Sequence, residues 1–147
     1  MKDVTELLLN KGQEIWSVGL TTPVFDALKL MADKNIGAVI VMDGTRLAGI
    51  LSERDYARKV ILRGKSSKDT PVSEIMSWDV ISVNPSESID GCMGLMTEKR
   101  IRHLPVLDNG DVVGVISISD VVEAVISDQD RMIGQLERYI TANAEIP

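Results

Sequence analysis

The chain contains an internal repeat with an offset of 65 residues, and this repeat constrains the fold more than any other feature of the sequence. Residues 49–55 (GILSERD) return as residues 114–120 (GVISISD). The same offset pairs Met31 with Met96, and about forty positions align without a gap. Self-similarity at a fixed period indicates that one supersecondary unit is present twice within the 147 residues.

Each copy has a first helix that we predict from its start signal and its apolar spacing. Thr22-Pro23 in the first copy and Pro85-Ser86 in the second suit helix starts. Apolar residues then fall at positions i, i+3, i+4 and i+7 in both copies, beginning at Val24 and at Ile89. Each helix therefore presents one apolar stripe, which we expect to face a sheet.

A hairpin and a second helix complete each copy as a βαββα unit. Asp43-Gly44 and Asn109-Gly110 are dipeptides that favour tight turns between two strands. Second helices are expected to begin near Glu53 and Ser119. The expected strands are residues 15–18, 38–42 and 47–51 in the first copy and residues 80–83, 104–107 and 112–116 in the second.

Neither unit can bury its apolar sheet face alone, so we expect an α/β fold in which two pseudo-twofold-related units pack through their sheets. An N-terminal helix with Val4, Leu7 and Leu8 on one side precedes them. The expected parts are an N-terminal helix and lead-in at 1–14, a first unit at 15–64, a linker at 65–79, a second unit at 80–126 and a C-terminal helix at 127–147.

The C-terminal helix carries Ile133, Leu136 and Ile140 at i, i+3 and i+7. These side chains either pack within the chain or meet a second chain, and the sequence leaves both readings open.

Composition excludes several classes of protein. With 16 basic and 22 acidic residues the formal net charge is −6, which argues against nucleic-acid and anionic-membrane binding. One cysteine, Cys92, and one histidine, His103, leave neither a disulfide nor a cluster of metal ligands. Cys92 falls on an apolar helix stripe and is interpreted as a core thiol. We therefore predict a non-catalytic cytoplasmic protein that needs no metal.

The repeated motif places a serine and an aspartate where a strand turns into a helix. Ser52 with Asp55, and Ser117 with Asp120, match a capping box that would satisfy the free N–H groups of the helix. The same geometry would also suit a sugar hydroxyl and a phosphate. Arg102 offers a planar fork for phosphate oxygens, so the motif has both a structural and a ligand-binding interpretation.

The sequence resembles a tandem pair of cystathionine β-synthase (CBS) domains, also called a Bateman module. The resemblance extends from about residue 11 to about residue 126 and rests on residues 35–38 (NIGA), the repeated motif, and residues 102–106 (RHLPV). It implies that an adenosine-bearing ligand binds in a cleft between the two domains. AMP or NAD is favoured, with ATP, ADP and S-adenosylmethionine as further candidates, and the resemblance also implies a homodimer.

The resemblance assigns roles to individual residues. Asp55 and Asp120 correspond to the ribose-binding aspartate, and Ser52 and Ser117 to the hydroxyl beside it. Arg54 lies inside the first motif, where it would contact phosphate in the first copy as Arg102 would in the second, and Ser119 lies inside the second motif. The residues expected to line the base and the phosphates are Ile36, Gly37, Ala38, Ile101, Arg102, His103, Ile15, Trp16, Ser77, Val80 and Ile81. Trp16 is larger than the residue usual there, so it would either stack on a base or fill the cleft.

Two functions are therefore considered. The first is a sensor whose conformation, and hence the activity of a regulated partner, responds to an adenine nucleotide. The second is a ligand-free dimeric interaction or scaffold protein whose clefts are closed and whose capping boxes are only structural.

Overall fold

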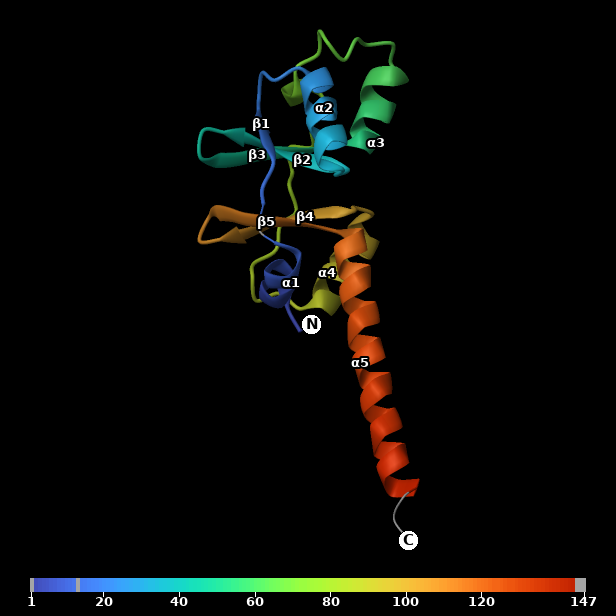
Figure 1. Ribbon diagram of the computed structural model, residues 1–147. Helices are drawn as coiled ribbons and strands as arrows, with labels where there is room; N and C mark the ends of the chain where they lie inside the picture. The colour runs from blue at the N-terminus through green and yellow to red at the C-terminus, as the bar shows by residue number, and fades with distance from the viewer. Residues whose placement is uncertain (1, 13, 145–147) are drawn as a thin grey trace. The chain divides into compact units, whose positions relative to one another are not determined.

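The computed structural model of the chain describes residues 2–12 and 14–144 (Figure 1). Its helices and strands are α1 (Val4–Lys11), β1 (Ser17–Gly19), α2 (Val24–Lys34), β2 (Ala38–Asp43), β3 (Arg46–Ser52), α3 (Glu53–Tyr56), α4 (Ile89–Lys99), β4 (His103–Asp108), β5 (Asp111–Ser117) and α5 (Ile118–Ala144). A π-helical turn, η1 (Ala57–Ile61), continues α3, and a 3-10 turn, η2 (Val72–Glu74), follows it. The pairs α2/α4, β2/β4 and β3/β5 begin and end 65 residues apart, which confirms the predicted α/β repeat.

The first strand of each copy differs from the prediction. In the first copy it lies at Ser17–Gly19 rather than 15–18, where it pairs in parallel with β2. In the second copy residues 80–83 form no named strand, and only Val83 takes part in an isolated bridge. The backbone there turns instead, because the Val80 N–H donates to Trp78 O at 3.1 Å and is not free for a ladder.

The two helix starts are capped differently. α2 begins directly after Pro23, as predicted. α4 begins at Ile89, later than Pro85-Ser86 suggests, because Ser88 Oγ accepts the Gly91 N–H at 2.9 Å. Ser86 Oγ instead donates to Asn84 Oδ1 at 2.6 Å within the preceding turn. The true cap was therefore a second serine two residues further on.

Both predicted hairpins form. The order of the three-stranded sheet is β1-β2-β3, and β4 and β5 form a two-stranded sheet. Asn109 and Gly110 both have positive φ, 52° and 86°, which is the requirement of a type I′ turn. In the first hairpin the turn is formed by Gly44-Thr45, with Gly44 at φ 63°, and Asp43 ends the strand.

The chain divides into two compact units, and each is described by itself. One unit comprises residues 14–82 and 105–115. In it the buried stripe of α2 (Val24, Ala27 and Met31) belongs to one apolar cluster with residues of β2, β3, η1 and η2. This cluster confirms that the predicted helix stripe faces the sheet.

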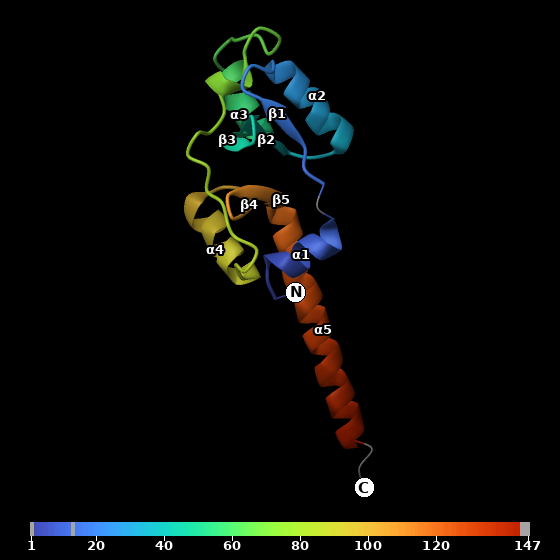
Figure 2. The same cartoon turned by 90° about the vertical axis from the view of Figure 1, so that its left-hand side faces the viewer.

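The other unit comprises residues 2–12, 83–104 and 116–144 of the described chain. Here α1 and α4 both pack against α5, and Figure 2 shows α1 beside the first turns of α5. The predicted side of α1 is buried, with Val4, Leu7 and Leu8 at most 2 % exposed. α4 contributes Cys92, which is fully buried as predicted.

α5 is one continuous helix of 27 residues, drawn in orange to red in Figure 1. It combines the second helix of the second copy with the predicted C-terminal helix. Ile133, Leu136 and Ile140 are 53 %, 59 % and 65 % exposed. At these positions the structure does not show the intrachain packing that one of the two interpretations required.

Candidate functional site

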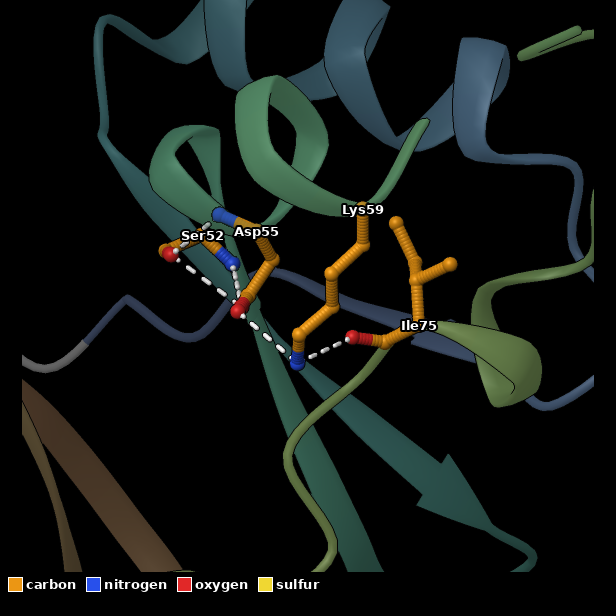
Figure 3. Close-up of polar contacts among 4 residues, drawn as sticks. All are labelled: Ser52, Asp55, Lys59 and Ile75. Carbon is orange, nitrogen blue, oxygen red and sulfur yellow. Dashed lines mark hydrogen bonds and ion pairs between the residues drawn. The ribbon is translucent and has the colours of Figure 1, made fainter. Parts of the chain in front are cut away.

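The first corner, where β3 turns into α3, is held by a capping box (Figure 3). The Asp55 N–H donates to Ser52 Oγ at 3.2 Å. The Ser52 N–H and the Ser52 hydroxyl both donate to Asp55 Oδ2, at 2.9 and 3.1 Å. The Glu53 N–H donates to Gly37 O at 3.0 Å, which ties the corner to the residue before β2. The structural interpretation of the motif is therefore confirmed here.

A lysine occupies the other oxygen of Asp55. Lys59 Nζ lies 3.3 Å from Asp55 Oδ1 and donates to Ile75 O at 3.0 Å (Figure 3). The two residues are i, i+4 neighbours on the helical segment, a spacing that brings such side chains together. The Asp55 side chain keeps 16 % of its surface exposed. A ligand hydroxyl approaching this carboxylate must therefore share it with Lys59 or displace the lysine.

The second corner, where β5 turns into α5, is built in the same way. The Ser117 N–H donates to Asp120 Oδ2 at 2.8 Å, and the Asp120 N–H donates to Ser117 Oγ at 3.2 Å. The Ile118 N–H donates to Arg102 O at 2.8 Å, the counterpart of the bond between Glu53 and Gly37. The sequence repeat thus extends to the hydrogen bonds of the two corners.

The second corner obtains its lysine from another element. Lys11, the last residue of α1, donates to Asp120 Oδ2 and forms an ion pair with it. The repeat position that corresponds to Lys59 is Ala124, which is fully buried. The Asp120 side chain keeps 20 % of its surface exposed. Both candidate aspartates therefore face a lysine, but the two lysines are not related by the repeat.

His103, the first residue of β4, lies beside this second group of charges. Burial lowers the pKa of His103 below its usual 6.5, and the positive charges of Lys11 and Arg102 lower it further. The negative charge of Asp120 raises the pKa but does not outweigh them. The imidazole is therefore neutral at pH 7. A neutral imidazole has one N–H donor and one acceptor nitrogen, which suits a polar ligand atom.

The glycine that opens the motif permits a close approach of two backbone segments. Ser77 and Ile50 exchange two backbone hydrogen bonds, at 3.1 and 2.9 Å. A Cβ on Gly49 would lie 2.8 Å from Ser77 O and 2.6 Å from Met76 Sδ. The motif glycine is thus explained by the approach of the segment that contains Ser77 to β3.

Trp16 has a partner within its own unit. Lys34 Nζ lies 4.2 Å from the centroid of the Trp16 ring, a cation–π distance. The sequence suggested either stacking on a base or filling of a cleft, and this contact was not foreseen.

The structure distributes the seventeen candidate residues over the two units. The unit of residues 14–82 and 105–115 contains Ile15, Trp16, Ile36, Gly37, Ala38, Ser52, Arg54, Asp55, Ser77, Val80 and Ile81. The other unit contains Ile101, Arg102, His103, Ser117, Ser119 and Asp120. Within each unit, backbone bonds bring the strand-start residues to the corner.

Two residues of these corners, Lys59 and Lys11, were missed by the sequence reasoning. The i, i+4 spacing between Asp55 and Lys59 was available as a signal, whereas Lys11 lies 109 residues from Asp120 and gave none.

The cysteine shows no sign of reactivity. Burial raises the pKa of the Cys92 thiol to about 11, with a further contribution from the charge of Glu87. The thiol is therefore protonated at neutral pH, in agreement with its interpretation as a core residue.

No helix within residues 2–12 and 14–144 combines the length and apolarity that a membrane span requires.

With this geometry established, the chain can be assigned to a family: the CBS domain model matches residues 4–62 and 72–127, and the chain belongs to the CBS-domain proteins as a tandem pair. It is 38 % identical to the mitochondrial CBS domain-containing protein CBSX3 of Arabidopsis thaliana, over 93 % of this chain and 71 % of that protein. It is 34 % identical to CBS domain-containing protein YhcV of Bacillus subtilis, over 73 % of this chain and 76 % of that protein.

Solved structures support the same assignment. A protein with CBS domains from Burkholderia ambifaria is 54 % identical, with a TM-score of 0.83 over 86 % of this chain and 96 % of that one. The CBS domain pair of protein MJ0100, whose structure holds 5′-methylthioadenosine and S-adenosylmethionine, has a TM-score of 0.76 at 23 % identity, over 86 % and 97 % of the two chains. At that identity the likeness concerns the fold. Proteins built from CBS pairs are regulatory, and this is the class to which the chain belongs.

Proposed function

We propose that this chain is a non-catalytic, cytoplasmic regulatory module that binds an adenosine nucleotide at Asp55 and Asp120 and alters the activity of a partner protein. AMP or NAD is the favoured ligand, ahead of ATP, ADP and S-adenosylmethionine, and the working form is a homodimer. The observation that carries the proposal is the duplicated corner, in which a partly exposed aspartate lies beside a helix N-terminus.

The chemistry of the corners supports a ribose ligand. Each carboxylate accepts one backbone N–H and still keeps part of its surface accessible, so a ribose hydroxyl can replace the lysine that now occupies it. In the second corner Arg102 and the neutral imidazole of His103 add donors for phosphate oxygens. The binding of adenosine derivatives by the CBS pair of MJ0100 supports the same class of ligand.

A thermal-shift panel tests the proposal. A ligand at about one hundred times its dissociation constant stabilises the folded state by about 2.7 kcal/mol, a rise in Tm of about 5–10 °C for a chain of this size. We expect Asp55→Asn and Asp120→Asn to reduce this rise, since the amide keeps an oxygen for the cap but loses the charge. Asp43→Asn and Asp108→Asn are matched controls, because these aspartates are exposed strand ends at equivalent repeat positions.

A second function, a scaffold whose corners are purely structural, is favoured by one observation. Each aspartate is already bonded by its own chain, through the cap and through Lys59 or Lys11. This alternative predicts that no adenosine ligand at millimolar concentration moves the melting curve. Such a result would remove the sensing proposal and leave the scaffold.

A further inference from the structure

The two corners differ in the charge that surrounds their aspartates. In the first corner the strand start is Ile36-Gly37-Ala38, which carries no charge, and the aspartate faces Lys59. In the second corner the strand start is Ile101-Arg102-His103, and the aspartate faces Lys11. Lys11 forms an ion pair with Asp120, and the charges of Lys11, Asp120 and Arg102 all act on His103. The second corner therefore gathers two basic side chains and a histidine near one carboxylate.

Lys11 is held at this place by a packed helix. The N-terminal end of α1 is anchored where the Val4 N–H donates to Glu87 O and the Thr5 N–H donates to Pro85 O, both at 3.0 Å. Its Leu7 and Leu8 are 2 % exposed. The helix ends at Lys11 itself, because Gly12 follows with φ 95° and donates to Leu8 O at 2.9 Å. The backbone of Lys11 is thus fixed, and ordering its ammonium costs only side-chain entropy.

The source of this lysine is independent of the repeat. Ala124 stands where a copy of Lys59 would lie, and its burial leaves no room for a charge. Lys59 lies inside the first copy and donates one hydrogen bond to Ile75 O. Lys11 lies at the end of α1, which belongs to neither copy of the repeat. The lysine of the second corner therefore comes from α1, whereas the lysine of the first corner comes from the helical segment that follows the motif.

Building on the proposed function, we propose that Lys11 is a specificity-determining residue of the second corner and selects adenosine ligands that carry a phosphate. When ribose hydroxyls occupy the Asp120 carboxylate, the ammonium of Lys11 moves on its four-carbon stem from Asp120 to the phosphate. Together with Arg102 it neutralises that group, and the uncharged His103 donates without adding a further charge. The first corner has an uncharged strand start, and its Lys59 is also bonded to Ile75 O, so no lysine makes this selection there.

A simpler role for Lys11 makes the opposite prediction. If Lys11 only occupied Asp120 in competition with ribose, its removal would free the carboxylate and tighten the binding of every adenosine ligand alike. A phosphate-selecting lysine instead loses affinity for phosphorylated ligands alone. The ratio between the affinities for AMP and for adenosine therefore separates the two roles.

The experiment is isothermal titration of the full chain with AMP and with adenosine, in the wild type, Lys11→Met, Lys11→Arg and Lys59→Met. Methionine keeps the apolar stem and the helix propensity but removes the charge. We expect Lys11→Met to weaken AMP binding about tenfold to a hundredfold, the range for loss of a charge-assisted hydrogen bond, and to change adenosine binding less than twofold. Lys11→Arg should restore most of the AMP affinity, and Lys59→Met should leave the ratio unchanged.

The outcomes are distinguishable. An unchanged ratio in Lys11→Met, or tighter binding of both ligands, overturns the role of Lys11 while the proposed function stands. If neither AMP nor adenosine binds the wild type, the proposed function fails and the role of Lys11 fails with it. The melting temperature of each variant, measured without ligand, shows whether a loss of AMP binding reflects a loss of folding.

Discussion

Replacement of Gly49 by alanine is a direct test of the close approach between β3 and the segment that contains Ser77. The new Cβ would lie 2.6 Å from Met76 Sδ and 2.8 Å from Ser77 O. The methionine side chain can move aside, but Ser77 O is a backbone atom that accepts the Ile50 N–H, and the Ser77 N–H in turn donates to Ile50 O. Overpacking of this kind costs about 1–3 kcal/mol, and the lower backbone entropy of alanine in the unfolded state offsets roughly 0.5–1 kcal/mol.

We therefore expect Gly49→Ala to lower the free energy of unfolding by about 1–2 kcal/mol, a fall in Tm of about 2–8 °C. The matched control is Gly94→Ala in α4, where a Cβ meets nothing within 4 Å. In a helix this change should stabilise the protein by up to about 1 kcal/mol. Urea unfolding followed by circular dichroism measures both. If Gly49→Ala is as stable as the wild type, the explanation of the motif glycine is wrong.

Three further predictions concern the helix cap, the histidine and the cysteine. Ser88→Ala should lower the free energy of unfolding, measured in urea, by about 1 kcal/mol because it removes the cap of α4. The control Ser86→Ala should change this free energy by less than about 0.5 kcal/mol, and equal effects would contradict the assigned cap. Because burial lowers the pKa of His103 in the folded protein, the unfolded chain takes up a proton first as the pH falls through 6.5. Between pH 7.5 and 5.5 the wild type should therefore lose more stability than His103→Gln, and parallel losses would refute this. With a thiol pKa of about 11, Cys92 should react with an alkylating reagent at pH 8 roughly a hundredfold more slowly in the folded than in the denatured chain, as followed by mass spectrometry; equal rates would show that the thiol is accessible.

The regular elements could be predicted from the sequence because the repeat and the helix spacing both depend on local patterns. Helix α2, the strands β2 and β3 and their copies appear at the same offset as the residues themselves. The predictions failed where neighbouring groups competed for the same hydrogen bond. Ser86 and Ser88 are equivalent in a pattern, and only the bond to the Gly91 N–H identifies the cap.

The candidate site shows the same division between local and distant information. The capping boxes follow from a spacing of three residues, and Lys59 follows from a spacing of four. Lys11 reaches Asp120 only because α1 packs against α5, a contact between the two ends of the chain. No periodicity in the sequence reports such a contact, so the cation of the second corner could be found only in the folded structure.

The central claim is that Asp55 and Asp120 bind the ribose hydroxyls of an adenosine ligand, and a double-mutant cycle measures this contact most directly. AMP and 2′,3′-dideoxy-AMP are titrated calorimetrically into the wild type and into the Asp55→Asn/Asp120→Asn variant. The account predicts that AMP binds the wild type at least tenfold more tightly than the dideoxy ligand and that this difference nearly disappears in the variant. The account is contradicted if the ratio between the affinities for AMP and for the dideoxy ligand is the same in both proteins, or if AMP does not bind the wild type.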